Sequence, residues 1–198
     1  MILIVDNYDS FTYNLVDMIA RQEEVIVKYP DDPTIYNLDV EALVISPGPG
    51  HPMDTTHLEH IIEHYHHKPI LGVCLGSQAL TCYYGGDVIQ CENIKHGKKD
   101  QMKIVDETLL YKDIPEYSEI MRYHSLMSNP DTFPESLKVT AQTKDCIQSF
   151  EHKINLHFGI QFHPESFATE YGTQMINNFL TVMKEVRDNG ATNTVETT

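Results

Sequence analysis

Short apolar runs alternate with amphipathic segments along the first half of the chain. The runs cover residues 2–5, 25–27, 42–45 and 70–73, and turn-forming residues bound each of them. Uniformly apolar runs of this length are typical of strands that are buried on both faces of a sheet. The pattern therefore predicts strands at the centre of a sheet that is covered on both sides.

Two segments between these runs have helical periodicity. The first repeats apolar residues through residue 19, with Ser10 as its expected N-cap. The second, over residues 56–65, begins with Thr56 and Glu59, which are spaced as a capping box. Alternation of strands and helices predicts an α/β fold with a central, mostly parallel mixed sheet flanked by helices.

The pattern changes after Gly85 and Gly86, where shorter strand-like pieces follow one another. These pieces cover residues 87–90, 102–105, 120–123, 137–141, 147–150 and 157–162. They predict a smaller, partly antiparallel portion of the fold. An amphipathic helix over residues 173–186 follows, and residues 188–198 lack periodicity. We therefore expect one domain over residues 1–187 and a flexible C-terminal tail over residues 188–198.

Composition narrows the possible partners and the compartment. The formal charge of −15 argues against binding to nucleic acids or anionic membranes, since phosphates would be repelled. The four cysteines form no Cys-x-x-Cys pair, and the apolar N-terminus ends at Asp6, too early for a signal peptide. These features predict a cytoplasmic protein with neither a structural zinc site nor a disulfide framework.

Cys74 is the strongest candidate for chemistry. It lies between Gly72 and Gly76, where an apolar strand meets a helix-forming stretch. This spacing is typical of a nucleophile elbow, whose tight turn requires small flanking residues. The helix N-terminus favours the thiolate, so the side chain is expected to act as a nucleophile. A small buried cysteine without chemistry is the alternative.

A cysteine nucleophile requires a base and a group that orients the base. His163 and Glu165 follow a strand-like run, and residues two apart in an extended chain point the same way. Pro164 would stiffen the backbone between them. A Cys74–His163–Glu165 triad is therefore possible, and a surface histidine beside a solvated acid is the alternative.

A loop rich in proline and glycine, residues 46–52, follows another predicted strand. Its glycines allow backbone N–H groups to approach a ligand, which suits an oxyanion hole shared with the amide of Leu75. An ordinary Pro/Gly connection is the alternative. A phosphate loop is disfavoured because no Lys-Ser/Thr pair follows the glycines.

Together these three segments resemble the class I, or triad, glutamine amidotransferases, and the likeness covers residues 1–187. Residues 6–12, 96–98 and 122–126 are similar to the branch that contains anthranilate synthase component II and the glutaminase subunit of aminodeoxychorismate synthase. The resemblance implies that Cys74 attacks glutamine, His163 transfers protons and Glu165 orients the imidazole. It also assigns the oxyanion hole to Gly48 and Leu75.

The same resemblance implies a set of substrate-binding residues for L-glutamine. They are Gly48, Pro49, Gly50, Gln78, Ser125 and Leu126. No cofactor or metal is implied for this chain, and a chorismate-using synthase large subunit is expected as its partner. Ser77 departs from the histidine usual in the family, which puts local packing or coupling to the partner in doubt more than the chemistry.

Several functions remain open at this point. The leading hypothesis is ammonia delivery for anthranilate formation in tryptophan biosynthesis, and the alternative is aminodeoxychorismate formation for folate. A stand-alone γ-glutamyl cysteine hydrolase could use the same triad. A noncatalytic receiver-like module is a further class, but it would have no use for Cys74. A metal site on the helix that carries His57, His60 and His64 is disfavoured because these residues fall on its polar face.

Overall fold

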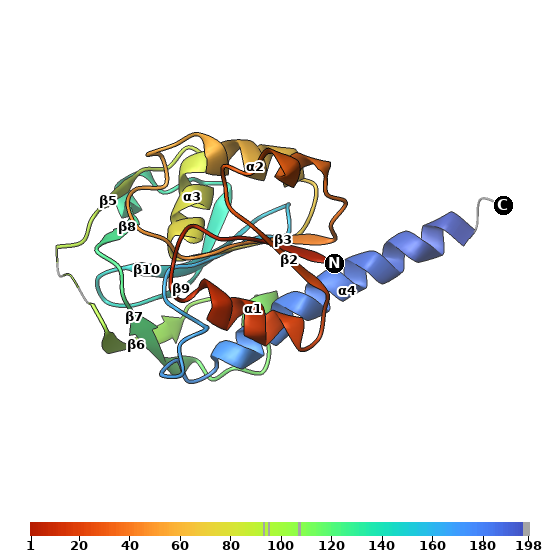
Figure 1. Ribbon diagram of the computed structural model, residues 1–198. Helices are drawn as coiled ribbons and strands as arrows, with labels where there is room; N and C mark the ends of the chain where they lie inside the picture. Colours follow the sequence, from red (N-terminus) through yellow and green to blue (C-terminus); the bar gives the residue numbers. More distant parts are fainter. Residues whose placement is uncertain (93, 95, 107, 196–198) are drawn as a thin grey trace.

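A nine-stranded mixed sheet runs through the part of the chain that the computed structural model describes, which is residues 1–92, 94, 96–106 and 108–195 (Figure 1). In spatial order its strands are β2 (Val25–Lys28), β1 (Ile2–Val5), β3 (Ala42–Ile45), β4 (Ile70–Val73), β11 (His157–Ile160), β10 (Ile147–His152), β9 (Leu137–Gln142), β6 (Lys98–Ile104) and β7 (Tyr117–Arg122). The first five are parallel to one another, and the remaining pairings are antiparallel. A separate antiparallel pair joins β5 (Val88–Gln90) to β8 (Leu126–Ser128). The predicted α/β fold with a smaller antiparallel portion is confirmed.

Helices cover both faces of the parallel half of the sheet (Figure 1). They are α1 (Thr12–Ala20), α2 (His57–Tyr65), α3 (Leu75–Tyr83) and α4 (Gly172–Val195), with short 3-10 turns η1 (Pro33–Asn37), η2 (Leu109–Tyr111) and η3 (Pro130–Thr132). Alternate residues of β1 face opposite layers: Ile2 and Ile4 pack with α1 and α4, whereas Leu3 and Val5 pack with α2 and α3. This alternation explains why the central strands are apolar at every position.

The predicted strands are found with small differences at their ends. Residues 2–5, 42–45 and 70–73 are strands with the predicted bounds, and the second strand extends one residue further, to Lys28. The pattern missed β8 and the first halves of β6 and β7. The first residues of β6 are polar and mostly exposed, and they pair with β7 alone, so no apolar alternation marks them.

Two predicted helix caps are wrong in detail. Helix α1 begins after Phe11 rather than Ser10, and neither Phe11 nor Thr56, the N-cap of α2, makes a side-chain capping hydrogen bond. At α1 the Oδ1 atoms of aspartates replace the expected serine: that of Asp9 accepts from Phe11 N at 2.8 Å, and that of Asp6 accepts from Thr12 Oγ1 at 2.9 Å. Two carboxylates thus hold the donors at the start of the helix.

Helix α4 is longer than predicted. It continues to Val195 and extends away from the body of the molecule, so the expected end near residue 186 is wrong (Figure 1). Arg187 and Lys184 pair with Glu23, at 3.4 Å and 3.3 Å, and link this helix to the turn between α1 and β2. Residues 196–198 of the predicted tail lie outside the described residues. No helix in the described ranges is long and apolar enough to cross a membrane.

Gly76 lies where α3 packs closely against β3, and it provides a test of this packing. A Cβ atom there would overlap the carbonyl oxygen of Ile45, whereas one at Gly85 would meet no atom within 4 Å but would sit at a φ of +91°. We expect Gly76→Ala to lower the free energy of unfolding by roughly 3 kcal/mol or more, because backbone must move. Gly85→Ala should cost only about 1–2 kcal/mol, from its left-handed backbone.

Urea unfolding of the two variants measures this difference. Equal losses for Gly76→Ala and Gly85→Ala would show that the α3–β3 contact is not tightly packed.

Candidate functional site

Cys74 forms the whole of the turn between β4 and α3. Its φ of 53° and ψ of −104° are unusual for a residue with a side chain. The backbone is held on both sides, since Cys74 N donates to Ile160 O at 2.7 Å and Cys74 O accepts from Gln78 N at 3.0 Å. The predicted strand–cysteine–helix turn is therefore present, with the side chain at the carboxyl edge of the sheet.

Gly72 and Gly76 leave the room that this turn requires. A Cβ atom on Gly72 would lie 2.7 Å from the backbone nitrogen of Ser77 and would also overlap the carbonyl group of Gly76. The first turn of α3 thus packs directly against the end of β4. Any larger residue at Gly72 would push the helix away from the strand and displace Cys74.

His163 and Glu165 lie in the turn that follows β11, beside the end of β4. His163 Nδ1 is 2.5 Å from Glu165 Oε1, and the two side chains are 3% and 0% exposed. The backbone of His163 is fixed as well, because its N–H donates to Met121 O at 3.1 Å and its carbonyl accepts from Thr169 Oγ1 at 2.6 Å. The imidazole is therefore rigidly placed.

His163 and Glu165 are paired as predicted, but the extended backbone that was expected to pair them is not present. The strand ends at Ile160 rather than at residue 162, and Ser166 N donates to His163 O at 3.2 Å across a turn. His163 and Glu165 therefore do not share the face of an extended strand. Their contact results from the turn, in which Pro164 has no N–H to satisfy.

The charge of His163 depends on its two polar neighbours. Burial disfavours the imidazolium, but hydrogen bonds with the side chains of Cys74 and Glu165 and the charge of the carboxylate outweigh it. Together they raise the pKa of His163 to about 10. The ring also meets the edges or faces of Phe11 and Tyr123, with centroids 5.5 Å and 5.1 Å away, which exclude water. His163 thus carries a proton at neutral pH.

The loop after β3 lies against the residue that follows Cys74. A Cβ atom on Gly48 would lie 2.7 Å from Leu75 Cδ2 and 2.5 Å from Asn7 Cβ, so only glycine fits this approach. Asn7 braces the loop, since its backbone N–H donates to Ser46 Oγ at 2.9 Å and its Nδ2 donates to Ser46 O at 2.8 Å. The sequence did not single out this bracing role of Asn7.

Pro49 and Gly50 form the exposed part of the same loop. Gly50 has a φ of +80°, and the next residue, His51, donates its N–H to Asp54 Oδ2 at 2.8 Å. Pro49 and Leu75 line a cavity of about 270 Å³. A larger cavity of about 820 Å³ lies elsewhere, against η2 and β6, and includes none of the predicted site residues.

Gln78 connects α3 to the segment that contains Ser125 and Leu126. Its Nε2 donates to Leu126 O at 3.0 Å and to Gln161 Oε1 at 3.1 Å. Gln161 Nε2 in turn donates to Cys74 Sγ at 3.7 Å. Ser125 is exposed, and its carbonyl accepts from Cys91 N at 2.8 Å. The structure therefore brings Gln78 and Leu126 into one hydrogen-bonded group with Cys74.

Gln161 is a further residue of the site that the sequence pattern did not predict. It lies two positions before His163 and is 2% exposed. Its place in the run that leads to His163 was the available signal, but its contact with Cys74 joins residues 87 positions apart. Among the residues described here, no group of three histidine, cysteine, aspartate or glutamate side chains is arranged to hold a metal ion.

A cysteine at a strand-to-helix turn beside a histidine–carboxylate pair is the arrangement of nucleophile, base and orienting group that covalent catalysis through a thiol requires. The sequence matches the family described as glutamine amidotransferase class-I over residues 3–183. Because the match spans most of the chain, the protein belongs to this family.

Curated relatives agree with this assignment. The chain is 42% identical to the aminodeoxychorismate/anthranilate synthase component 2 of Bacillus subtilis, over 94% of this chain and 99% of that protein. It is 38% identical to anthranilate synthase component 2 of Lactococcus lactis, over 95% and 98%. It is also 42% identical to a multifunctional tryptophan biosynthesis protein of Phycomyces blakesleeanus, of which it spans only 24%.

Solved structures share the fold at low sequence identity. The crystal structure of a GMP synthase-type protein from Thermoplasma acidophilum has a TM-score of 0.87 and 22% identity, with 96% of each chain covered. A glutamine amidotransferase from Thermotoga maritima has a TM-score of 0.70 and 17% identity, over 96% of this chain and 84% of that one. The mixed sheet and its helices are therefore the fold of these proteins.

The protonation of His163 can be tested with Glu165→Gln. This change removes the carboxylate charge but leaves the ring buried, so the pKa of His163 should fall from about 10 by about one unit or more. The imidazolium would then lose its proton at a lower pH. Titration of the imidazole nitrogen signals by NMR measures the midpoint. Glu170→Gln, which changes an exposed carboxylate in the next turn, should leave the midpoint in place, and an unchanged midpoint in Glu165→Gln contradicts the assignment.

Proposed function

We propose that this protein is the glutaminase component of an anthranilate synthase, which hydrolyses L-glutamine and delivers ammonia to a chorismate-using large subunit. The observation that carries the proposal is the contact of Cys74 with the His163–Glu165 pair at the turn between β4 and α3. The names of the relatives from Bacillus subtilis and Lactococcus lactis, which the chain matches over nearly their full length, support the pathway.

The first half of the reaction forms a thioester. The Cys74 sulfur attacks the side-chain amide carbon of glutamine, and the carbonyl oxygen becomes an oxyanion. The backbone N–H groups of Gly48 and Leu75 would stabilise this oxyanion, a role worth roughly 3 kcal/mol per donor. His163 then donates its proton to the amide nitrogen, the C–N bond breaks, and ammonia leaves.

The second half returns the free enzyme. Neutral His163 accepts a proton from a water molecule as that water attacks the thioester carbon, and the C–S bond breaks to release glutamate. Glu165 holds the imidazole through Nδ1, so Nε2 is the nitrogen that exchanges protons. The buried carboxylate also stabilises the imidazolium in each half of the cycle.

Glutamine recognition is proposed for residues around this centre. They are Gly48, Pro49, Gly50, Gln78, Ser125 and Leu126. Gln78 and Leu126 are linked to each other by a hydrogen bond of 3.0 Å, and Gly48 packs against Leu75. A substrate held between the loop after β3 and the Leu126 segment would place its side-chain amide at Cys74.

The acceptor of the ammonia is proposed to be a separate large subunit in the cytoplasm. We expect this partner to bind chorismate and any magnesium that its chemistry requires, while this chain uses no cofactor. Aminodeoxychorismate synthesis is a second candidate, since the Bacillus subtilis relative carries both names. A stand-alone γ-glutamyl hydrolase is the remaining alternative.

The role of Cys74 is tested by Cys74→Ser. Glutamate release from glutamine should fall by at least about 10³-fold, because the hydroxyl is a far weaker nucleophile than the thiolate. His163→Ala should also reduce turnover strongly. Cys82→Ser is the matched control, because Cys82 lies in α3, the helix that Cys74 precedes. Burial raises the pKa of the Cys82 thiol to about 11. Wild-type turnover by Cys74→Ser would contradict the proposed function.

The partner is tested by reconstitution with a chorismate-using large subunit. Glutamine hydrolysis by the isolated chain should be slow, and it should rise when chorismate and the large subunit are added. Chromatography of the aromatic product then separates anthranilate from aminodeoxychorismate. Full activity of the isolated chain would instead favour the stand-alone hydrolase.

A further inference from the structure

Gln161 contacts the sulfur of the proposed nucleophile from the side of β11. Its Nε2 lies 3.7 Å from Cys74 Sγ, within the range of a hydrogen bond to sulfur, and the side chain is buried. Its backbone is fixed at the end of the strand, since Gln161 N donates to Gln148 O at 2.8 Å. A buried amide in this position is rigid enough to act on the thiol.

The direction of the Gln161 amide follows from its neighbours. Leu126 O can only accept hydrogen bonds, so the atom of Gln78 that faces it at 3.0 Å must be the donor Nε2. The same Nε2 donates to Gln161 at 3.1 Å, so the atom of Gln161 that faces Gln78 must be Oε1. Gln161 therefore turns its N–H group toward Cys74 Sγ, because a flipped amide would place its own N–H group against the donor Nε2 of Gln78, with no acceptor between them.

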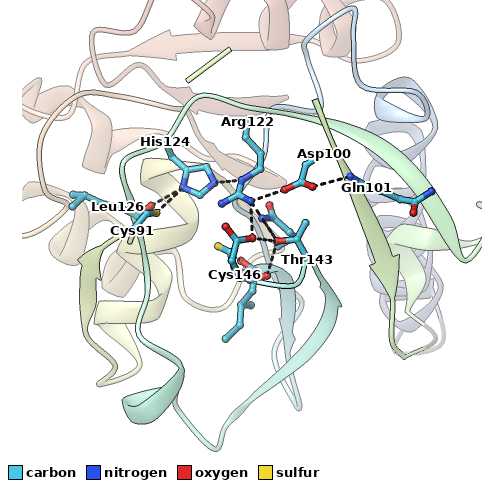
Figure 2. Close-up of polar contacts among 11 residues, drawn as sticks. Cys91, Asp100, Gln101, Arg122, His124, Leu126, Thr143 and Cys146 are labelled. Carbon is cyan, nitrogen blue, oxygen red and sulfur yellow. Dashed lines mark hydrogen bonds and ion pairs between the residues drawn. The ribbon is translucent and has the colours of Figure 1, made fainter. Parts of the chain in front are cut away.

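The directions of these hydrogen bonds depend on the carbonyl group of Leu126, which His124 contacts. His124 Nδ1 lies 2.8 Å from Leu126 O, and His124 Nε2 lies 3.2 Å from Arg122 Nε (Figure 2). A guanidinium group has no acceptor, so Nε2 must accept from Arg122 and the single ring proton must be on Nδ1. This tautomer donates to Leu126 O, which thus receives one hydrogen bond from His124 and one from Gln78.

Arg122 is itself fixed by two carboxylates. Its side chain is fully buried, and Nη1 lies 2.7 Å from Asp100 Oδ2 and 2.9 Å from Asp145 Oδ1 (Figure 2). A buried cation is retained only where anions compensate it. Burial and the charge of Arg122 lower the pKa of His124 to about 4, so the ring stays neutral and keeps its single proton at physiological pH.

We propose that Gln161 is a further catalytic residue, which donates a hydrogen bond to the Cys74 sulfur, and that Arg122 and His124 are positioning residues that set the direction of this donor through Leu126 and Gln78. The inference rests on the proposed function, in which Cys74 is the nucleophile. A donor at the sulfur stabilises the thiolate of the free enzyme and the thiolate that leaves during hydrolysis of the thioester.

The experiment measures alkylation of Cys74 by iodoacetamide in the full-length protein, read by mass spectrometry between pH 5 and about 9. Gln161→Met removes the donor at similar volume, and Gln161→Glu keeps the acceptor toward Gln78 but removes the donor. Both should slow alkylation at pH 7 by about tenfold, since a hydrogen bond to a charged group is stronger than one to a neutral group and its loss disfavours the reactive thiolate. Cys82 and Cys146, whose pKa values burial raises to about 11 and about 12, serve as internal references.

Asn178→Leu is the matched control for replacing a buried amide. Asn178 is buried in α4, and its Nδ2 donates to Leu110 O at 2.8 Å and to Lys112 O at 3.0 Å, outside the chain of contacts that reaches Cys74. Alkylation of Cys74 in this variant should match the wild type whatever its melting temperature. Unchanged alkylation in both Gln161 variants would overturn the proposal.

The positioning role is tested by two changes at His124. His124→Asn places an N–H donor where Nδ1 lies, and His124→Gln places an acceptor where Nε2 lies. We compare the rate of Cys74 alkylation and the KM for the substrate glutamine with their wild-type values. The change in each should be about tenfold smaller in His124→Asn than in His124→Gln. Equal effects of the two variants, with equal losses of melting temperature, would show a purely structural role.

The two proposals fail in different ways. Alkylation reports on the Cys74 thiol without glutamine, whereas glutamate release reports on the whole reaction. Normal glutamate release by Cys74→Ser would refute the proposed function, while normal alkylation in Gln161→Met would refute only the role of Gln161.

Discussion

The backbone turn at Cys74 is the constraint on which the arrangement of the site depends. A residue with a side chain at φ 53° carries strain of about 1–3 kcal/mol. The turn persists because Cys74 N is bonded to Ile160 O of β11 and Cys74 O to Gln78 N of α3. These bonds also fix the neighbours of the sulfur. The end of β11 leads directly to Gln161 and His163, so the strained residue and the groups that act on it share one hydrogen-bonded framework.

The two halves of the sheet contribute different parts of this framework. The parallel half supplies the turn at Cys74 and the loop at Gly48, because parallel strands end at the same edge. The antiparallel half supplies Arg122, at the end of β7, and the separate β5–β8 pair supplies Leu126, at the start of β8. Buried charge in the second half is tolerated because Asp100 and Asp145 compensate Arg122. The fold thus keeps a rigid polar cluster beside an apolar core.

The pattern of apolar residues predicted the strands whose formation depends on burial. Apolar runs predicted β1, β3 and β4 with their observed bounds. These strands are buried on both faces, so each of their residues is apolar and the run ends where the strand ends. The polar start of β6 and the short β8 were missed, since pairing rather than burial makes them strands. Cys74, His163 and Glu165 stood in recognisable short motifs. Gln161 and the bracing by Asn7 did not, because their contacts join segments 39 to 87 positions apart.

The two histidines near the site differ in charge, since one is protonated and the other is neutral. Burial disfavours the charged form of both rings. At His163 the contacts with Cys74 and Glu165 outweigh burial and raise the pKa to about 10, whereas at His124 the charge of Arg122 adds to burial and the pKa falls to about 4. The charge of His163 also lowers the pKa of His124. A proton carrier and a fixed neutral donor can therefore coexist in one buried cluster. If His124 were charged, Nε2 could not accept from Arg122, and the contact that orders Leu126, Gln78 and Gln161 would be lost.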